Sequence, residues 1–314
     1  MLIHLVIALA SLGVLYVGAE LLVRGASRLA AVARISPAVV GLTVVAFGTS
    51  MPELSVSVLA SLEDASDVAL GNVVGSNIFN VAFILGLSTL VRPLPIERSL
   101  LVRDIPLMVL VSVGLVGLAW DAELTRADAA LLLILFGAYC AMTLRGARAA
   151  GATETGEPRP RSRPLGHIAA VVLGLGLLVG GGQGLVRSGM EIARALEVPE
   201  LVIAVTLVAA GTSLPEVATS VVAAARRETE IAVGNIVGSN LFNILAILGA
   251  AALIDPLPVA RPAIRYHLPV MVAVACLLVP LAVTRSRLSR WEGGLLLGAY
   301  AAYCAALVLV ESFR

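Results

Sequence analysis

The stretch VGLTVVAFGTSMPELSVSV, residues 40–58, returns at an offset of 163 as IAVTLVAAGTSLPEVATSV, residues 203–221. Across the thirteen positions that end in Pro-Glu, eight are identical in the two copies. A second pair follows at the same offset, because GNVVGSNIFN, residues 71–80, matches GNIVGSNLFN, residues 234–243, at eight of ten positions. One offset without a gap joins both pairs, so the chain contains an internal repeat.

The composition is that of a membrane protein. Of 314 residues, 59% are hydrophobic and 14% are charged, and the mean hydropathy is +0.98, whereas globular chains are about a quarter charged. All 22 basic residues are arginine, and no basic run alternates with aromatic residues, which argues against nucleic-acid binding. The three cysteines stand singly in apolar stretches, which favours neither a zinc site nor a redox pair.

Hydropathy predicts an all-α polytopic protein of ten transmembrane helices, since each span needs about 20 apolar residues. The first span lacks a preceding basic region, so we expect it to be retained rather than cleaved as a signal. The ten predicted spans are residues 2–23, 37–61, 68–91, 104–120, 127–144, 166–186, 199–225, 230–254, 266–284 and 291–311.

A polar segment, residues 145–164, separates five predicted spans from the next five. It is rich in Pro, Gly and Arg, so we expect a disordered linker, too short for a folded regulatory domain, between a first repeat (1–144) and a second (165–314). Loops after odd-numbered spans hold 16 of the 22 arginines. Because cytoplasmic loops are rich in arginine, we expect a cytoplasmic linker and external termini in the cell's inner membrane.

An odd number of spans per repeat makes the second copy enter the membrane from the opposite face. The chain is therefore predicted to consist of two inverted five-helix repeats, the architecture that secondary transporters use for alternating access around a site at mid-membrane. Duplication for stability alone is the weaker alternative, because the best-matched residues are polar ones at mid-span.

Glu53 and Glu216 occupy equivalent positions deep inside predicted spans. A charged residue at the centre of a helix costs about 2.5–3.5 kcal/mol on insertion scales. A bound cation would compensate this cost, and the alternative is a protonated glutamate hydrogen-bonded between helices. The other acidic residues of the spans are expected near span ends, within reach of water: Glu20, Asp104, Asp128, Asp255 and Glu292.

The residues around the two glutamates suit a hard cation. Thr49, Ser50 and Ser57 share a helical face with Glu53, and Thr212, Ser213 and Ser220 repeat the pattern around Glu216. Pro52 and Pro215 free the carbonyls four residues earlier. Carbonyl, hydroxyl and carboxylate oxygens select Ca²⁺, Na⁺ or Mg²⁺ over soft metals.

The second motif supplies polar stripes for a facing helix. Asn72, Ser76 and Asn80 are spaced by four, as are Asn235, Ser239 and Asn243. The GxxxG pairs at 71/75 and 234/238 permit close helix contact. The asparagines could instead join helices structurally, and Asn72 and Asn235, nearer the span ends, are the stronger candidates for that role.

Charge balance favours an antiporter, because two glutamates neutralise one Ca²⁺ and release it readily only to competing Na⁺ ions or protons. These motifs, GTSMPE with GNVVGSNIFN and GTSLPE with GNIVGSNLFN, resemble the two α-repeats of the cation/Ca²⁺ exchanger superfamily over essentially the whole chain. The prokaryotic sodium/calcium exchangers are the most similar branch.

The resemblance implies four cation sites between spans 2, 3, 7 and 8. It implies that Glu53 and Glu216 ligate Ca²⁺ with the carbonyls of Thr49 and Thr212, and that Asn80 and Asn243 complete the centre. It implies Na⁺ ligation by the glutamates together with Ala46, Ser50, Ser76, Ala209, Ser213 and Ser239. Ca²⁺ and Na⁺ are then substrates in a lipid bilayer, with no cofactor and no obligatory protein partner.

Two differences from the motifs of related branches bear on which ion is coupled to Ca²⁺ transport. Asn243 replaces the Asp of some members, and both equivalents are amides, which disfavours K⁺ co-transport. The repeats of proton-coupled branches centre on GNxxE, and this chain has no acidic residue at the corresponding place. Na⁺ coupling is therefore favoured over proton coupling, the alternative in which the chain is a Ca²⁺/H⁺ exchanger.

Two other classes of protein have weaker support. An intramembrane hydrolase lacks a mid-membrane His beside Ser50 or Ser213, and a passive channel fits poorly with occluded carboxylates. In the antiporter, spans 1 and 6 would slide or rock across the core on glycine-rich faces, and plain helix packing is the alternative explanation of these faces. The glycines of span 6 are Gly174, Gly176, Gly180, Gly181, Gly182 and Gly184.

Overall fold

The computed structural model describes residues 1–63, 65–153, 164–196 and 211–312, which form helices and four two-residue strands. The first repeat comprises α1 (Leu2–Ala33), α2 (Pro37–Val40), η1 (Gly41–Val45), α3 (Ala46–Thr49), α4 (Met51–Leu62), α5 (Ser66–Ile78), η2 (Phe79–Ile84), α6 (Leu85–Val91), β1 (Leu94–Pro95), η3 (Leu100–Asp104), α7 (Ile105–Leu118), η4 (Ala119–Asp121), β2 (Glu123–Leu124) and α8 (Arg126–Thr153). The second comprises α9 (Pro164–Ala195), α12 (Leu214–Ala225), α13 (Thr229–Phe242), η6 (Asn243–Leu248), α14 (Gly249–Ile254), β3 (Leu257–Pro258), η7 (Ala263–His267), α15 (Leu268–Val283), β4 (Arg287–Leu288) and α16 (Arg290–Ser312).

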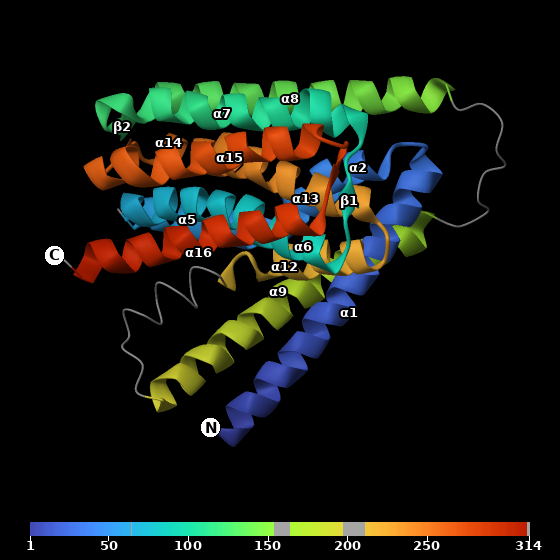
Figure 1. The fold of residues 1–314 in the computed structure, drawn as a ribbon, viewed down its shortest axis with the longest axis horizontal. Coiled ribbons are helices and arrows are strands. Elements are labelled where there is room, and N and C mark those ends of the chain that lie inside the picture. The colour runs from blue at the N-terminus through green and yellow to red at the C-terminus, as the bar shows by residue number, and fades with distance from the viewer. Residues whose placement is uncertain (64, 154–163, 197–210, 313–314) are drawn as a thin grey trace.

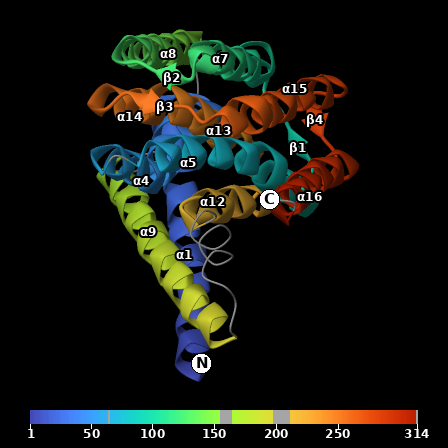
Figure 2. The ribbon, with the colours of Figure 1, turned by 90° about the vertical axis from the view of Figure 1, so that its left-hand side faces the viewer.

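The helices form a layered bundle with one pair set apart from it. Figures 1 and 2 show α7 and α8 on one side, then α13 to α15, then α4 and α5, while α1 and α9 run obliquely across the opposite side. The two oblique helices touch through backbone, because a Cβ built on Gly174 would lie 2.7 Å from the Leu22 nitrogen and 2.8 Å from the Gly18 oxygen.

The predicted glycine face of span 6 is confirmed in part. Gly174 and Gly181 lie against α1, and Gly184 lies against the Ser11 hydroxyl. A Cβ at Gly176 or Gly180 would meet no described atom within 4 Å, and Gly182 faces α12 instead. The glycines are spread around a helix, so one neighbouring helix contacts only some of them.

Seven helices of the described chain are long and apolar enough to cross a membrane, and the bent pair Pro37–Thr49 and Met51–Leu62 makes up to eight. The helices of the first and sixth predicted spans, α1 and α9, are longer than predicted, at 32 residues each. The two predicted spans stop just before Arg24 and Arg187, because a charged residue lowers the hydropathy. Arg24 pairs with Glu20 one turn earlier, however, which supports a continuing helix. Part of the predicted seventh span, residues 199–225, lies outside the described residues, so the number ten stays a prediction.

The linker prediction is wrong at its start. α8 continues to Thr153, so residues 145–153 of the predicted disordered linker are helical. Four of these nine residues are alanine, the best helix former, and this run outweighs its two glycines.

A break in the second span places its polar motif. The backbone of Ser50 leaves the helical region (φ −85°, ψ 9°), and the helices on either side differ by 47°. Pro52, in the first turn of α4, cannot donate to the preceding turn, which explains the break. The two helices of the second motif, α5 and α13, continue without a break into wider π-helical turns, η2 and η6, which begin at Phe79 and Asn243.

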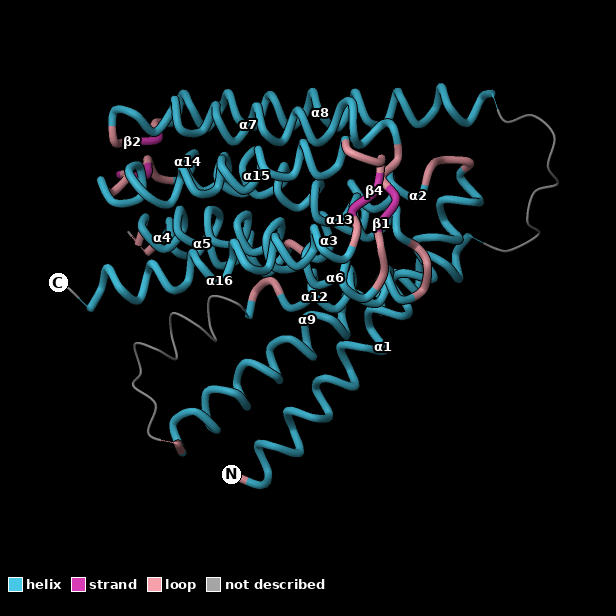
Figure 3. The backbone as a smooth tube through the Cα atoms, viewed as in Figure 1, coloured by secondary structure: helices cyan, strands magenta, loops and turns pink. Residues whose placement is uncertain are grey.

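Two short antiparallel sheets connect loops of the two repeats. β1 pairs with β4, and β2 pairs with β3. Figure 3 shows β1 and β4 at one end of the bundle and β2 at the other. Each sheet therefore joins a loop of one repeat to a loop of the other at the same end of the bundle.

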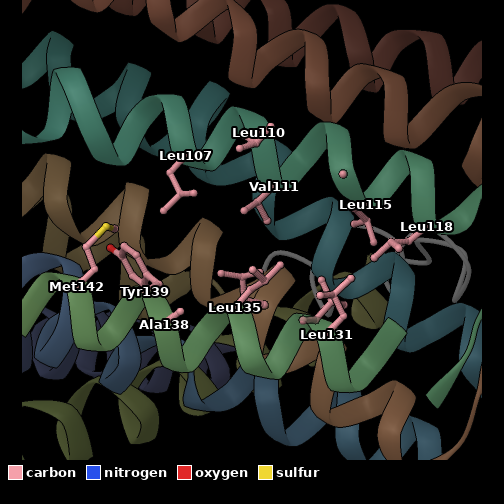
Figure 4. A pocket seen from close by; sticks show the side chains of 13 residues that line it. Leu107, Leu110, Val111, Leu115, Leu118, Leu131, Leu135, Ala138, Tyr139 and Met142 are labelled. Carbon is pink, nitrogen blue, oxygen red and sulfur yellow. The ribbon is translucent and has the colours of Figure 1, made fainter. Parts of the chain in front are cut away.

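The outer surface is apolar, as expected for contact with lipid. A cleft of about 410 Å³ lies between α7 and α8. In Figure 4, Leu107, Leu110 and Val111 of α7 lie opposite Leu131 and Leu135 of α8. The Tyr139 hydroxyl is the polar side-chain group of this lining. The cleft lacks the charged groups that an ion would need.

Candidate functional site

The two buried glutamates stand at equivalent places in the first turns of α4 and α12. Glu53 is 1% exposed and Glu216 is 0% exposed. Each follows a helix start at which serine takes the N-cap position, Ser50 for α4 and Ser213 for α12. A serine there normally accepts a bond from its own helix, but neither of these side chains does so.

The serine hydroxyls reach across to the other repeat instead. Ser50 Oγ donates to Glu216 Oε1 at 2.8 Å, and Ser213 Oγ donates to Glu53 Oε1 at 2.8 Å. Hydrogen bonds to an ionised acceptor are about twice as strong as neutral ones. The exchange of bonds brings the two GTSxPE motifs together, as the sequence predicted for a shared site.

The second motif lines the same network. Ser239 Oγ lies 3.0 Å from Ser50 Oγ, and Ser76 Oγ lies 3.3 Å from Ser213 Oγ. A serine that donates its single proton to a glutamate accepts from its serine neighbour. Ser76 and Ser239 therefore extend each glutamate's polar environment onto α5 and α13.

Asn72 and Asn235 brace each helix pair, the structural role that the sequence left open. Asn72 Nδ2 donates to the Glu53 backbone oxygen at 3.1 Å and to Ser57 Oγ at 2.9 Å. Asn235 Nδ2 donates to Ser220 Oγ at 3.0 Å. The asparagine oxygens lie near the threonines of the opposite repeat, with Thr49 Oγ1 at 3.2 Å from Asn235 Oδ1 and Thr212 Oγ1 at 3.5 Å from Asn72 Oδ1.

Four buried oxygens of the predicted site have no hydrogen-bond partner in the described chain: Glu53 Oε2, Glu216 Oε2, Asn80 Oδ1 and Asn243 Oδ1. They form two equivalent pairs, one from each repeat. A buried acceptor without a donor costs about 1–3 kcal/mol, and more when charged. A protonated glutamate joined to a neighbour would need an acceptor for Oε2, whereas a cation needs unoccupied oxygens, so the geometry favours a cation.

The remaining predicted ligands are placed in part. Ala46 is buried, and its carbonyl accepts the Ser50 backbone N–H at 3.1 Å and the Thr49 hydroxyl at 3.4 Å. Ala209 lies outside the described residues. Within the described chain no three His, Cys, Asp or Glu side chains group together, so oxygen donors of other kinds must complete any ion's coordination.

Two further carboxylates are buried, contrary to the prediction that they lie within reach of water. Asp104 is 0% exposed, but Arg103 donates to both of its oxygens at 3.0 Å. Glu292 accepts from the Ser289 backbone and hydroxyl at 2.6 Å, as a cap of α16. Protein donors reach both residues, because partners adjacent in sequence fold onto them.

Sequence reasoning missed Asn77 and Asn240. Both are buried and bonded across the repeats. They lie off the four-residue spacing of the polar stripes, which is why pattern alone passed over them. The available signal was the third polar residue of each GNxVGSN motif, which occupies equivalent positions in the two copies.

Comparison with known proteins identifies the family. The model described as sodium/calcium exchanger protein matches residues 3–145 and 166–309. The putative antiporter CaxA of Alkalimonas amylolytica is 37% identical over 313 residues, covering 96% of this chain and 98% of that protein. The sodium/calcium exchanger MaX1 of Methanosarcina acetivorans is 33% identical over 347 residues, covering 98% and 99%.

Solved structures agree with the sequence matches. The sodium-calcium exchanger NCX_Mj, in a structure soaked with 10 mM Na⁺ and 10 mM Sr²⁺, matches with a TM-score of 0.85 at 31% identity. The match covers 97% of this chain and 98% of that one. The apolar helices, the fold and both sets of matches show that this chain belongs to the sodium/calcium exchanger family, whose members are multi-pass membrane antiporters rather than enzymes.

Proposed function

We propose that this chain exchanges Ca²⁺ for Na⁺ across the membrane by alternating access. The observation that carries the proposal is the equivalent pair of buried glutamates, each with one oxygen bonded by a serine of the other repeat and one oxygen that no donor of the described residues reaches. Relatives favour these ions, since MaX1 is named a sodium/calcium exchanger and NCX_Mj was soaked with Na⁺ and Sr²⁺.

Glu53 and Glu216 bind Ca²⁺ in this proposal, with the carbonyls of Thr49 and Thr212. Asn80 and Asn243 turn their oxygens toward the centre, supported by the lack of a donor to either oxygen in the described chain. The Na⁺ ligands, besides the glutamates, are Ala46, Ser50, Ser76, Ala209, Ser213 and Ser239. Hard oxygen donors throughout suit both ions.

The proposed topology is ten spans in two inverted repeats, with the linker cytoplasmic and the termini outside. The β1–β4 sheet joins the loops after spans 3 and 9, and the β2–β3 sheet joins those after spans 4 and 8. Because successive spans cross the membrane in opposite directions, two loops separated by an even number of spans lie on the same side. The pairing of these loops in the two sheets supports the proposed topology. In Figure 1 the start of α1 and the end of α16 lie toward one end, and the end of α8 lies at the other.

Access to the site is proposed to alternate as α1 and α9 move across the core. A cavity of about 390 Å³ lies between α9 and the starts of α4 and α12, and it is bordered by Pro52, Thr212 and Pro215. Gln183 and Arg187 of α9 also line it. A shift of α9 would change this cavity, whose lining residues Pro52 and Pro215 directly precede the two glutamates in the sequence.

Transport by the purified chain tests the proposal. Proteoliposomes loaded with Na⁺ and diluted into choline medium with ⁴⁵Ca²⁺ should take up Ca²⁺, and those loaded with choline should not. A vesicle set with a pH gradient and no Na⁺ tests proton coupling. Uptake driven by the pH gradient alone would identify the Ca²⁺/H⁺ exchanger, and non-saturable uptake without counter-ion would identify a channel.

Replacement of the glutamates tests the ligand assignment. Glu53→Gln and Glu216→Gln keep the shape but remove the charge, so each should abolish ⁴⁵Ca²⁺ uptake. Glu123→Gln is the matched control, because Glu123 is exposed at β2 and should leave uptake unchanged. Normal uptake by either site variant would refute the assignment.

A further inference from the structure

Two buried amides that the exchange site does not itself use join the repeats at the centre of the molecule. Asn77 Nδ2 donates to the backbone oxygen of Asn240 at 3.3 Å, and Asn240 Nδ2 donates to the backbone oxygen of Asn77 at 3.4 Å. Each Nδ2 also faces a methionine sulfur, Met271 at 3.8 Å and Met108 at 3.5 Å. The arrangement is reciprocal between α5 and α13.

The backbone oxygens determine which way these two amides point. A carbonyl accepts and never donates, so a flipped Asn77 would place its own oxygen against the Asn240 carbonyl. Two facing acceptors in a buried setting lose a hydrogen bond and repel each other. Asn77 and Asn240 are therefore held with Nδ2 toward the backbone and Oδ1 away from it.

Their oxygens in turn orient the two site asparagines, each in the other repeat. Asn77 Oδ1 accepts from Asn243 Nδ2 at 3.0 Å, and Asn240 Oδ1 accepts from Asn80 Nδ2 at 3.0 Å. Since each Nδ2 is engaged, Oδ1 of Asn80 and Asn243 must point the other way. Those are two of the four buried oxygens of the predicted site that receive no bond from the part of the chain that the structure describes.

We propose that Asn77 and Asn240 are positioning residues, which hold the amides of Asn243 and Asn80 with oxygen rather than nitrogen toward bound cations. A reversed amide would present an NH₂ group, whose partial positive charge repels Na⁺ and Ca²⁺. The inference rests on the proposed function. It adds a crossed dependence, in which Asn77 controls Asn243 while Asn240 controls Asn80.

Double-mutant cycles test this dependence through Ca²⁺ binding to the purified full-length chain by calorimetry. Asn77→Leu removes the acceptor of Asn243 but leaves the backbone carbonyl that orients Asn240, so it should weaken binding about tenfold, as supporting residues of metal sites do. In a chain that carries Asn243→Leu, the same change should weaken binding little further. In a chain that carries Asn80→Leu, it should again weaken binding about tenfold.

The mirror cycle gives an independent measurement, in which Asn240→Leu couples to Asn80→Leu and not to Asn243→Leu. Met108→Leu is the matched control, because it removes only the weak thioether contact to Asn240 Nδ2 and keeps every amide and backbone oxygen of the network, so it should leave binding unchanged. Melting temperatures measured without ions identify variants that fail to fold. If the variants of only one of the two cycles fold, that cycle tests the positioning role.

Three results would overturn the inference. Asn77→Leu could leave binding unchanged, or couple equally to Asn80→Leu and Asn243→Leu, while the unsubstituted chain binds Ca²⁺; either result refutes the positioning role alone. If the unsubstituted chain binds no Ca²⁺, the proposed function and the inference fail together. Crossed coupling in either cycle supports the positioning role.

Discussion

At the scale of single residues, the candidate site depends on hydroxyls that leave their ordinary local role. Ser50 and Ser213 stand where a serine usually caps its own helix, yet each bonds the glutamate of the other repeat. Glu53 and Glu216 are thereby held in place, while one oxygen of each has no donor among the described residues. The buried Asp104, with both oxygens bonded by Arg103, shows the contrasting structural case.

Loss of either serine hydroxyl should weaken cation binding. Ser50→Ala removes the donor to Glu216, and Ser213→Ala removes the donor to Glu53. Hydrogen bonds to charged groups contribute about 1.5–3 kcal/mol, so apparent Na⁺ affinity should fall by about tenfold or more in transport assays. Ser55→Ala is the control, because Ser55 is exposed on the same helix and donates to the Met51 carbonyl. Equal effects of Ser50→Ala and Ser55→Ala would contradict the role.

At the scale of helices, the contact of α1 with α9 depends on missing side chains. Gly18 and Gly174 bring the two backbones together, and the ion pair of Arg226 with Glu20 and the bond from Ser27 to Glu228 connect α1 to the end of α12. Exposed ion pairs contribute little stability. The glycine contact is therefore the feature that sets the spacing of this pair of helices.

Gly174→Ala should destabilise the chain and slow exchange. The added Cβ would lie within 3 Å of α1 backbone atoms, which cannot move independently of their helix. Overpacking of this kind costs about 1–3 kcal/mol. Gly176→Ala on the same helix meets no described atom within 4 Å and serves as the control. Thermal unfolding in detergent and Na⁺-driven ⁴⁵Ca²⁺ uptake measure both effects, and a melting temperature of Gly174→Ala equal to that of the control would disprove the close contact.

At the scale of the whole molecule, the two repeats are interlocked rather than juxtaposed. Each small sheet takes one strand from each repeat, and each glutamate takes its serine partner from the other repeat. A change at one end of the bundle is thus mechanically connected to both halves of the site. Neither repeat contains a complete set of these contacts by itself.

The proposed topology predicts which positions face the cytoplasm. In a chain whose native cysteines are replaced by serine, Thr155→Cys in the linker should react with a membrane-impermeant maleimide only after the cells are permeabilised. Ile3→Cys at the start of α1 should react in intact cells, because the arginine distribution predicts external termini. Labelling of Thr155→Cys in intact cells would show that the orientation is reversed.

The sequence by itself determined the helical membrane class, the repeat with its offset of 163, and the two glutamates with their serines. These follow from hydropathy and from spacing along one helix, which are local properties. The sequence predicted that Pro52 frees an earlier carbonyl, but the span 37–61 was predicted as one helix, and the break at Ser50 is a finding of the structure. Local patterns failed where the burial of a side chain depends on the packing, as at Asp104, and where a helix continues beyond the apolar run, as at α8.

Only the tertiary structure decided which partners meet. That Ser50 bonds Glu216 rather than its own helix, and that Asn77 directs Asn243, depends on packing between segments about 160 residues apart. Helical periodicity specifies the face on which a side chain lies, but it contains no information on which other helix covers that face. The packing of the repeats supplies that information, and among residues 1–63, 65–153, 164–196 and 211–312 it provides no donor for four oxygens of the predicted site, which form two equivalent pairs.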